Sequence, residues 1–346
     1  MKIFACFFSI LYCITAFSSV SSYNASPYLL NSQTIKIEGI ENQYSDEEIR
    51  KYNIKDDLLF FKKHIDQEIL KNISILGPKT VLRDACEYSL TTGGKRYRPS
   101  IILMIADALG SKVDSIGSAL SVEFFHTASL IADDLPCMDN DDERRGLPTL
   151  HKVYGETLAV LSTYALISAA FESLEKNINS LEDSELFSEE EINQIARIAL
   201  KTATHCAGMS GVTGGQFLDL FPPKLTVESI KEVIYKKTVS LFEASFVFGW
   251  IFSGGNLDLI ENVKKTAYHF GLAFQIVDDL GDVLQDVKNK RDVNMANLIG
   301  KEAAFALFEE EFFSFKASLQ ELNIDTPAFQ NMSTLLYQKA VQNLRE

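Results

Sequence analysis

The sequence has few of the residues that interrupt or cross-link a chain. Its 346 residues include 18 glycines, 8 prolines, one tryptophan and five cysteines. The cysteines show neither CxxC spacing nor a histidine at zinc-finger distance, so neither a disulfide framework nor a zinc finger is indicated. We therefore expect Cys86, Cys137 and Cys206 to be reduced thiols.

Signals for strands are also missing. No stretch alternates apolar and polar residues, no Asn-Gly or Asp-Gly hairpin signal occurs, and no segment repeats at a solenoid period. Helical patterns instead follow one another to the C-terminus. We predict a mostly helical protein.

Basic residues are outnumbered by acidic ones. The chain holds 33 Lys and Arg against 47 Asp and Glu, for a net charge of −14. Such a balance argues against a broad basic face and hence against nucleic acid as a partner. Any phosphate must be bound by local groups of basic residues.

The N-terminus differs from the rest of the chain. Lys2 precedes an apolar run and then the small polar stretch "SSVSSYNAS", which is the pattern of a secretory signal peptide. The run is short for a membrane span, so we favour a cleaved signal over an anchor. We expect contact with a membrane only if this N-terminal segment is not cleaved. The predicted divisions are a targeting segment at 1–22, a polar leader at 23–44 and one domain at 45–346.

Two segments help to place the helices of that domain. Ser45 and Glu48 have capping-box spacing and predict its first helix. The acidic stretch 172–191 is predicted to be a surface connection and the start of the next helix.

The first aspartate cluster lies in "DDLPCMDNDDERRG". Asp133 and Asp134 follow an apolar helical approach, and Pro136 disfavours continuation of that helix. A local break would let Asp139 converge with Asp133. Aspartates at the end of a buried helix favour a site for a hard divalent cation over a solvated turn.

The second cluster lies in "FQIVDDLGD". Asp278 and Asp282 are four residues apart, so both face one side of a helix, with Asp279 adjacent. Carboxylates brought together without a cation would repel each other. Two such clusters indicate several Mg²⁺ ions, which usually bridge carboxylates to substrate phosphates.

Three compact basic groups suit a diphosphate substrate. They are Lys95, Arg96 and Arg98 in "GGKRYRP", Arg144 and Arg145 after the first aspartates, and Lys236 and Lys237 in "YKKTVSLFEAS".

Together with "GGQFLDL", these motifs resemble those of the trans-isoprenyl diphosphate synthases (the polyprenyl synthetase family), and within it the geranylgeranyl diphosphate synthases. The resemblance runs from about Leu58 to the end. It implies one all-α domain, an isoprenoid synthase helical bundle around a deep apolar cavity, with both aspartate clusters facing each other at its mouth, and usually a homodimer.

The resemblance also assigns roles to individual residues. Thr238 and Gln275 would lie beside the reacting carbons, while Arg144 and Lys237 would hold an allylic diphosphate. The diphosphate of isopentenyl diphosphate would be held by Lys95, Arg98, His126 and Arg145. The implied Mg²⁺ ligands are Asp133, Asp134, Asp139, Asp278, Asp279 and Asp282. Asp141 and Asp142 are left out, as solvated or outer-shell groups.

The implied reaction is a Mg²⁺-dependent head-to-tail condensation. The allylic diphosphate (dimethylallyl, geranyl or farnesyl) ionises, the double bond of isopentenyl diphosphate attacks the cation, and a proton is lost. The chain departs from the family pattern after Asp282, where the usual lysines have no clear counterpart. Lys288, Lys290 or Arg291 could replace them by position.

In this family a floor beneath the allylic tail sets product length. Ala128, the fifth residue before Asp133, and Ser129 are small where a farnesyl-making enzyme usually has an aromatic residue. Phe125 lies three residues further, roughly 4.5 Å along a helix. We expect this lower floor to give geranylgeranyl diphosphate.

Several alternatives remain open from the sequence. The product could be farnesyl or a longer chain, and a class I terpene cyclase or a non-catalytic regulatory subunit is a rival function. Two aspartate clusters and "GGKRYRP" weigh against both rivals. The signal-like start favours a plastid reached through the secretory route, with the endoplasmic reticulum or cytoplasm as alternatives.

Overall fold

The computed structural model describes residues 56–184, 186–222, 224–289 and 291–346. The predicted targeting segment, the polar leader and the helix start at Ser45 lie outside these residues. Cys86, Cys137 and Cys206 are free thiols, as predicted.

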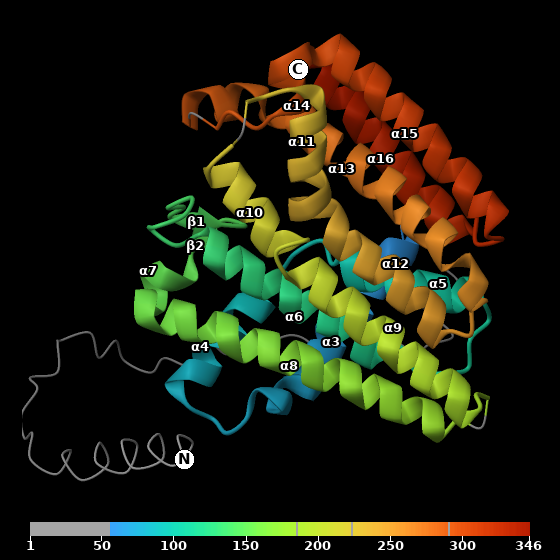
Figure 1. Cartoon of the computed structure of the whole chain (residues 1–346). Coiled ribbons are helices and arrows are strands. Elements are labelled where there is room, and N and C mark those ends of the chain that lie inside the picture. The colour runs from blue at the N-terminus through green and yellow to red at the C-terminus, as the bar shows by residue number, and fades with distance from the viewer. Residues whose placement is uncertain (1–55, 185, 223, 290) are drawn as a thin grey trace, which may run out of the picture. The chain divides into compact units, whose positions relative to one another are not determined.

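Helices make up most of the described chain and strands very little of it, which confirms the all-α fold class (Figure 1). The elements in chain order are α3 (Asp56–Asn72), η1 (Ile73–Leu76), α4 (Val81–Thr91), α5 (Tyr97–Ala108), α6 (Ile116–Asp133), β1 (Glu143–Arg144), β2 (Leu147–Pro148), α7 (Leu150–Tyr154), α8 (Glu156–Glu182), α9 (Glu189–Ala207), α10 (Val212–Leu220), α11 (Val227–Ile234), η2 (Tyr235–Val239), α12 (Ser240–Phe252), η3 (Leu257–Leu259), α13 (Ile260–Asn289), α14 (Met295–Ile299), α15 (Lys301–Glu321) and α16 (Pro327–Arg345).

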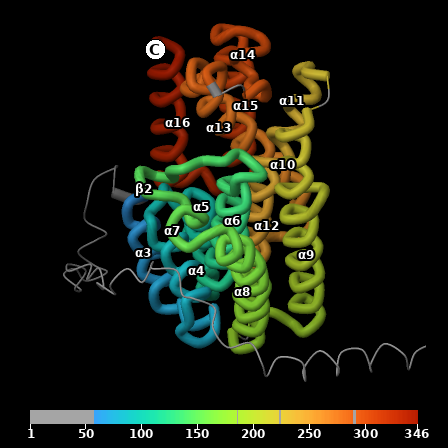
Figure 2. The backbone as a smooth tube through the Cα atoms, turned by 90° about the vertical axis from the view of Figure 1, so that its left-hand side faces the viewer, coloured from blue at the N-terminus to red at the C-terminus, as the bar shows by residue number. Residues whose placement is uncertain are grey.

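The core is built around α12, in which every residue is buried. Helices α5, α6, α9 and α13 pack around it (Figures 1 and 2). Phenylalanine rings fill the contact with α13, since Phe242 meets Phe270 edge-on with ring centroids 4.9 Å apart. A helix that is apolar all round must be enclosed by others, and this enclosure makes α12 the centre of the bundle.

One small hairpin was not predicted. Strands β1 and β2 pair antiparallel, Glu143 opposite Pro148. The turn residues Arg145 and Gly146 have φ of 57° and 76°, as a type I′ turn requires at both central positions. The prediction missed the hairpin because Arg-Gly is not among the usual sequence signals for this turn.

The acidic stretch 172–191 is also more helical than predicted. Helix α8 continues to Glu182, because Ser173, Leu174 and Leu181 keep its buried face. Helix α9 then starts with a complete capping box between Ser188 and Glu191. The surface connection is therefore limited to the few residues between these helices.

Candidate active site

The first aspartate cluster is built on the end of α6. The helix stops at Asp133, three residues before Pro136, and the chain folds back so that the amide of Asp139 donates to the Asp133 carbonyl at 2.9 Å. Asp133 and Asp139 therefore converge, as predicted. Burial, reinforced by Asp139, raises the pKa of Asp133 to about 7, although Lys237 opposes the rise.

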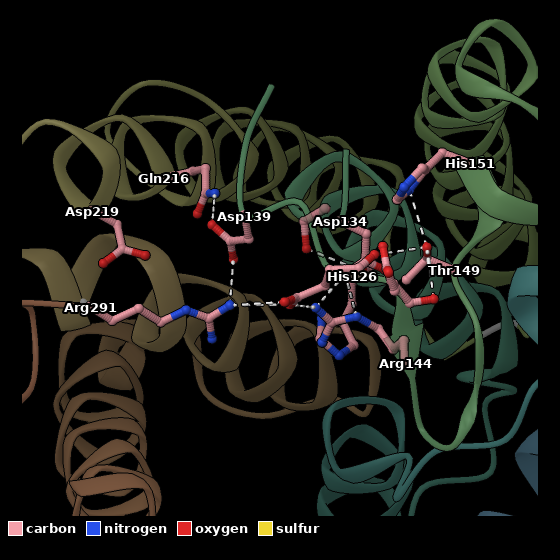
Figure 3. A network of polar contacts seen from close by, with 12 residues as sticks. His126, Asp134, Asp139, Arg144, Thr149, His151, Gln216, Asp219 and Arg291 are labelled. Carbon is pink, nitrogen blue, oxygen red and sulfur yellow. Dashed lines mark hydrogen bonds and ion pairs between the residues drawn. The ribbon is translucent and has the colours of Figure 1, made fainter. Parts of the chain in front are cut away.

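Asp134 points into the protein rather than across the site. Its side chain is buried and accepts a hydrogen bond from Nε of Arg144 at 2.7 Å, with a second from the same guanidinium (Figure 3). Arg144 also approaches Asp141 at 3.5 Å. The structure thus engages Arg144, predicted to bind the allylic diphosphate, with carboxylates of the first cluster.

Gln216 and Asp219, which were not among the predicted site residues, complete this cluster together with Arg291, one of the three basic residues predicted to replace the family's lysines. Nε2 of Gln216 on α10 donates to Asp139 at 3.2 Å, and Nη2 of Arg291 lies 3.1 Å from Asp141 and 4.0 Å from Asp139 (Figure 3). Asp219, also on α10, pairs with Lys237. The motif "GGQFLDL" was the available signal for Gln216 and Asp219, because their polar side chains interrupt an apolar helix.

The second cluster lies within α13, so Asp278 and Asp282 share one face, as predicted. Burial raises the pKa of Asp278 to about 6, while the nearby charge of Lys95 opposes the shift. Burial also raises the pKa of Asp282, and the charge of Arg291 opposes that rise. Arg291 in turn contacts Asp139 and Asp141. Arg291 thus lies between the two clusters.

Asp279 differs from its neighbours because the protein itself binds both of its oxygens. Nε2 of Gln275 donates to Oδ1 at 2.9 Å and the amide of Met295, the first residue of α14, donates to Oδ2 at 2.8 Å. The carboxylate is only 5% exposed. It anchors α14 to α13, and its predicted contact with Mg²⁺ would have to compete with these bonds.

Thr238 and Gln275, predicted to lie beside the reacting carbons, are in direct contact. The hydroxyl of Thr238 donates to Oε1 of Gln275 at 2.7 Å. Thr238 lies in the π-helical turn η2, which follows α11 and leads into α12. Such turns are frequent at functional sites, and this one also carries Lys237.

The motif "GGKRYRP" contains two arginines with opposite surroundings. Arg96 is buried and forms ion pairs with Asp66, at 2.8 Å, and Glu123. Arg98 has no carboxylate partner among the described residues: its guanidinium lies 3.4 Å from His126 and 4.3 Å from the ring centre of Phe242, and its Nε is buried without a partner. Burial lowers the pKa of Arg98 to about 10.

The charge of Arg145 acts on Arg98 and contributes to its lowered pKa. Arg145 donates to the backbone carbonyl of Gly93, and its pKa is lowered by burial and by neighbouring arginines. His126, with its pKa well below the usual value because of burial and Arg98, is neutral at pH 7. Lys95 is exposed beside Tyr97. Of the four residues predicted to bind isopentenyl diphosphate, His126 is therefore neutral, and Lys95, Arg98 and Arg145 carry charges that no ion pair occupies among the described residues. The nearby charges of Lys95 and Arg98 both act on Asp278.

The predicted chain-length residues lie on α6. Phe125 and Ala128 are buried, and the ring of Phe125 packs edge-on against Phe171 of α8 with centroids 5.2 Å apart. The hydroxyl of Ser129 donates to the carbonyl of His126 at 2.8 Å. Their effect on product length stays a prediction.

The donor set fits magnesium in its chemistry. The carboxylates of both clusters are oxygen donors, and burial raises the pKa of Asp133, Asp278 and Asp282, so that their charged forms are disfavoured without a cation. In the described part of the chain no three acidic, histidine or cysteine side chains are close enough to hold an ion by themselves. Substrate oxygens and water would complete the coordination, as they usually do for Mg²⁺.

Comparisons with known proteins identify the family of the chain. The family model for polyprenyl synthetase matches residues 79–296. Geranylgeranyl pyrophosphate synthase 3, chloroplastic, of Arabidopsis thaliana is 39% identical over 63% of this chain and 59% of its own length. The large subunit 1 of a heterodimeric geranylgeranyl pyrophosphate synthase of the same plant, also chloroplastic, is 40% identical over 60% of this chain and 55% of its own.

A solved structure is also similar. The crystal structure of an FPP/GFPP synthase from Zymomonas mobilis superposes with a TM-score of 0.69 at 29% identity, covering 82% of this chain and 98% of that one. The match to the plant relatives covers less than two thirds of their length.

Proposed function

Because the chain belongs to the polyprenyl synthetase family, we propose that it is a prenyltransferase that condenses isopentenyl diphosphate with allylic diphosphates to give geranylgeranyl diphosphate. The observation that carries this proposal is that the aspartate clusters and the unpaired arginines form two different kinds of binding group. Two groups of carboxylates suit a metal-bound diphosphate, while Arg98 and Arg145, with the neutral His126 beside Arg98, offer donors that no carboxylate ion pair occupies in the described part of the chain. A site for two different diphosphates supports condensation over cyclisation of one substrate.

The residues suggest how the reaction is divided. Magnesium, when bound, would neutralise charge on the leaving diphosphate. Asp133, Asp139, Asp278 and Asp282 would hold it, and Lys237 would add a fixed positive charge to the same side.

The partner substrate would be held on the other side by Arg98. Phe242 contacts the face of this guanidinium and leaves its N–H groups free for a diphosphate, whereas a carboxylate would occupy them. Thr238 and Gln275 hold each other in one orientation near the developing allylic cation. The departing diphosphate is a suitable base for the final proton.

Product analysis tests the proposal. The protein would be incubated with Mg²⁺, isopentenyl diphosphate and, separately, dimethylallyl, geranyl or farnesyl diphosphate, and products would be identified by mass spectrometry. We expect geranylgeranyl diphosphate, and none from Asp278→Asn. A folded protein that condenses nothing would contradict the proposal and favour the cyclase or regulatory subunit.

We also propose that the protein forms a homodimer through α8. This is the one described helix that is long and apolar enough to cross a membrane, and 44% of its apolar window is buried. On its outer side Leu161, Tyr164 and Ile167 are exposed. The relative named as a heterodimeric large subunit supports subunit contact in this family. Tyr164→Glu should give monomers in light scattering, whereas Leu284→Glu, at an exposed site on α13, should not.

A plastid is the proposed location. The signal-like N-terminus and the chloroplastic relatives support it. Residues 1–55 fused to a fluorescent protein should direct it to plastids. Diffuse cytosolic fluorescence would contradict both the plastid and the endoplasmic reticulum.

A further inference from the structure

Gly281 occupies an unusual place for a glycine. It lies inside α13, between Asp278 and Asp282, where glycine weakens a helix. The space that a side chain would fill is already taken. A Cβ on Gly281 would lie 2.6 Å from Nδ2 and 3.2 Å from Cγ of Asn343 on α16.

Asn343 contacts the backbone of α13 next to the second cluster. It is only 2% exposed, and its Nδ2 donates at 2.7 Å to the carbonyl of Val277, the residue before Asp278. Its Oδ1 has no hydrogen-bond partner among the described residues. A buried amide with one unsatisfied oxygen is costly, so ordinary packing does not account for it well.

The end of α16 is held from a second side. Nζ of Lys301, the first residue of α15, donates to the carbonyl of Asn343 at 3.2 Å. Helix α16 therefore presents Asn343 to α13 from a fixed position. One turn earlier, the charge of Lys339 opposes the rise in pKa that burial causes in both Asp278 and Asp282.

We propose that Gly281 and Asn343 are a positioning pair, through which the C-terminal helix holds α13 so that Asp278 and Asp282 face the mouth. The glycine removes the side chain that would keep Asn343 away, and Asn343 then fixes the backbone next to Asp278. What the two aspartates bind rests on the proposed function, but the fit itself does not.

The fit can be tested by whether Gly281→Ala raises or lowers the melting temperature in the wild-type protein and in the Asn343→Ala variant. In an ordinary helix Gly→Ala raises the melting temperature, here by roughly 2–4 °C. Gly281→Ala should instead lower it, because the new methyl group displaces Asn343 from the Val277 carbonyl. In an Asn343→Ala background the same substitution should raise it. A change of the same sign in both backgrounds would overturn the pair.

The positioning role needs a binding measurement. Binding of inorganic diphosphate at fixed Mg²⁺ can be measured by calorimetric titration. The affinity of Asn343→Ala should be lower than that of the wild type by about tenfold or more, the usual loss when a group that orients metal ligands is removed. The matched control is Gln342→Ala, which truncates an exposed amide next to Asn343. Unchanged affinity in folded Asn343→Ala would overturn the role. A wild-type protein that binds Mg²⁺ and diphosphate but makes no prenyl product would overturn only the proposed function.

Discussion

The first aspartate cluster is built on the end of a helix and the turn after it, whereas the second lies wholly within a helix. The first is held together by side chains from other elements, Arg144, Gln216 and Arg291. The second is supported through its backbone and its middle aspartate, by Asn343 of α16 and Met295 of α14.

Despite this difference, both clusters divide their aspartates in the same way. The middle residue of each, Asp134 or Asp279, is buried at 4% or 5% exposure and bonded within the protein. Of the outer residues, Asp139 accepts a hydrogen bond from Gln216 and lies near Arg291, and the side chains of Asp133, Asp278 and Asp282 form no ion pair within the described residues. Adjacent aspartates in the sequence therefore have different roles. The outer carboxylates suit metal ions, and the middle ones orient the structure that carries them.

The largest expected effect comes from an outer aspartate. Asp133→Asn or Asp278→Asn should each lower kcat by roughly 10²–10³-fold, the usual loss when one group that stabilises transition-state charge is removed. Steady-state kinetics over a range of Mg²⁺ concentrations would measure it. Asp142→Asn, at an exposed residue paired with Lys152, is the control. If kcat fell in only one of the two variants, the two clusters would not act together.

The middle aspartates should affect stability instead. In Asp279→Asn one carboxylate oxygen becomes an NH₂ group, so either the Gln275 amide or the Met295 amide loses its acceptor. Because that donor stays buried without a partner, the free energy of unfolding should fall by about 1–3 kcal/mol. Denaturant unfolding would measure it, with Asp282→Asn expected to cause no loss. Equal stability of the two variants would contradict the division between middle and outer residues.

Arg291 links the two clusters, and we expect it to replace the family's missing lysine. Arg291→Ala should raise the KM for the allylic diphosphate roughly tenfold, the effect of losing about 1.4 kcal/mol of binding, and leave the KM for isopentenyl diphosphate unchanged. Lys288→Ala, at an exposed residue that is the rival candidate for this role, should leave the allylic KM unchanged. If both variants keep the wild-type allylic KM, neither residue has this role.

The smallest effect on rate should come from the helix of the first cluster. Phe125→Ala should lengthen the product and Ala128→Tyr should shorten it towards farnesyl diphosphate, because both change the depth available to the tail. Phe270→Leu, at the corresponding distance before Asp278, should leave chain length unchanged. Product sizes from mass spectrometry decide it, and an unaltered distribution in both α6 variants would place the floor elsewhere.

The sequence was sufficient where local rules apply. The missing strand signals and helical periodicity predicted the all-α fold, and the fourfold spacing of Asp278 and Asp282 predicted their common face, because one continuous helix carries both. Pro136 predicted the break that brings Asp139 back to Asp133. The motifs in their order identified the family.

The tertiary structure decided which charges are paired. Arg96 and Arg98 are two residues apart in one motif, yet Arg96 reaches Asp66 and Glu123, while the contacts of Arg98 within the described residues are with His126 and an aromatic ring. Likewise, Gly281 is intelligible only with Asn343, 62 residues later, in the space beside it. Local pattern sets the direction of a side chain, but its partner comes from whichever distant element packs against it.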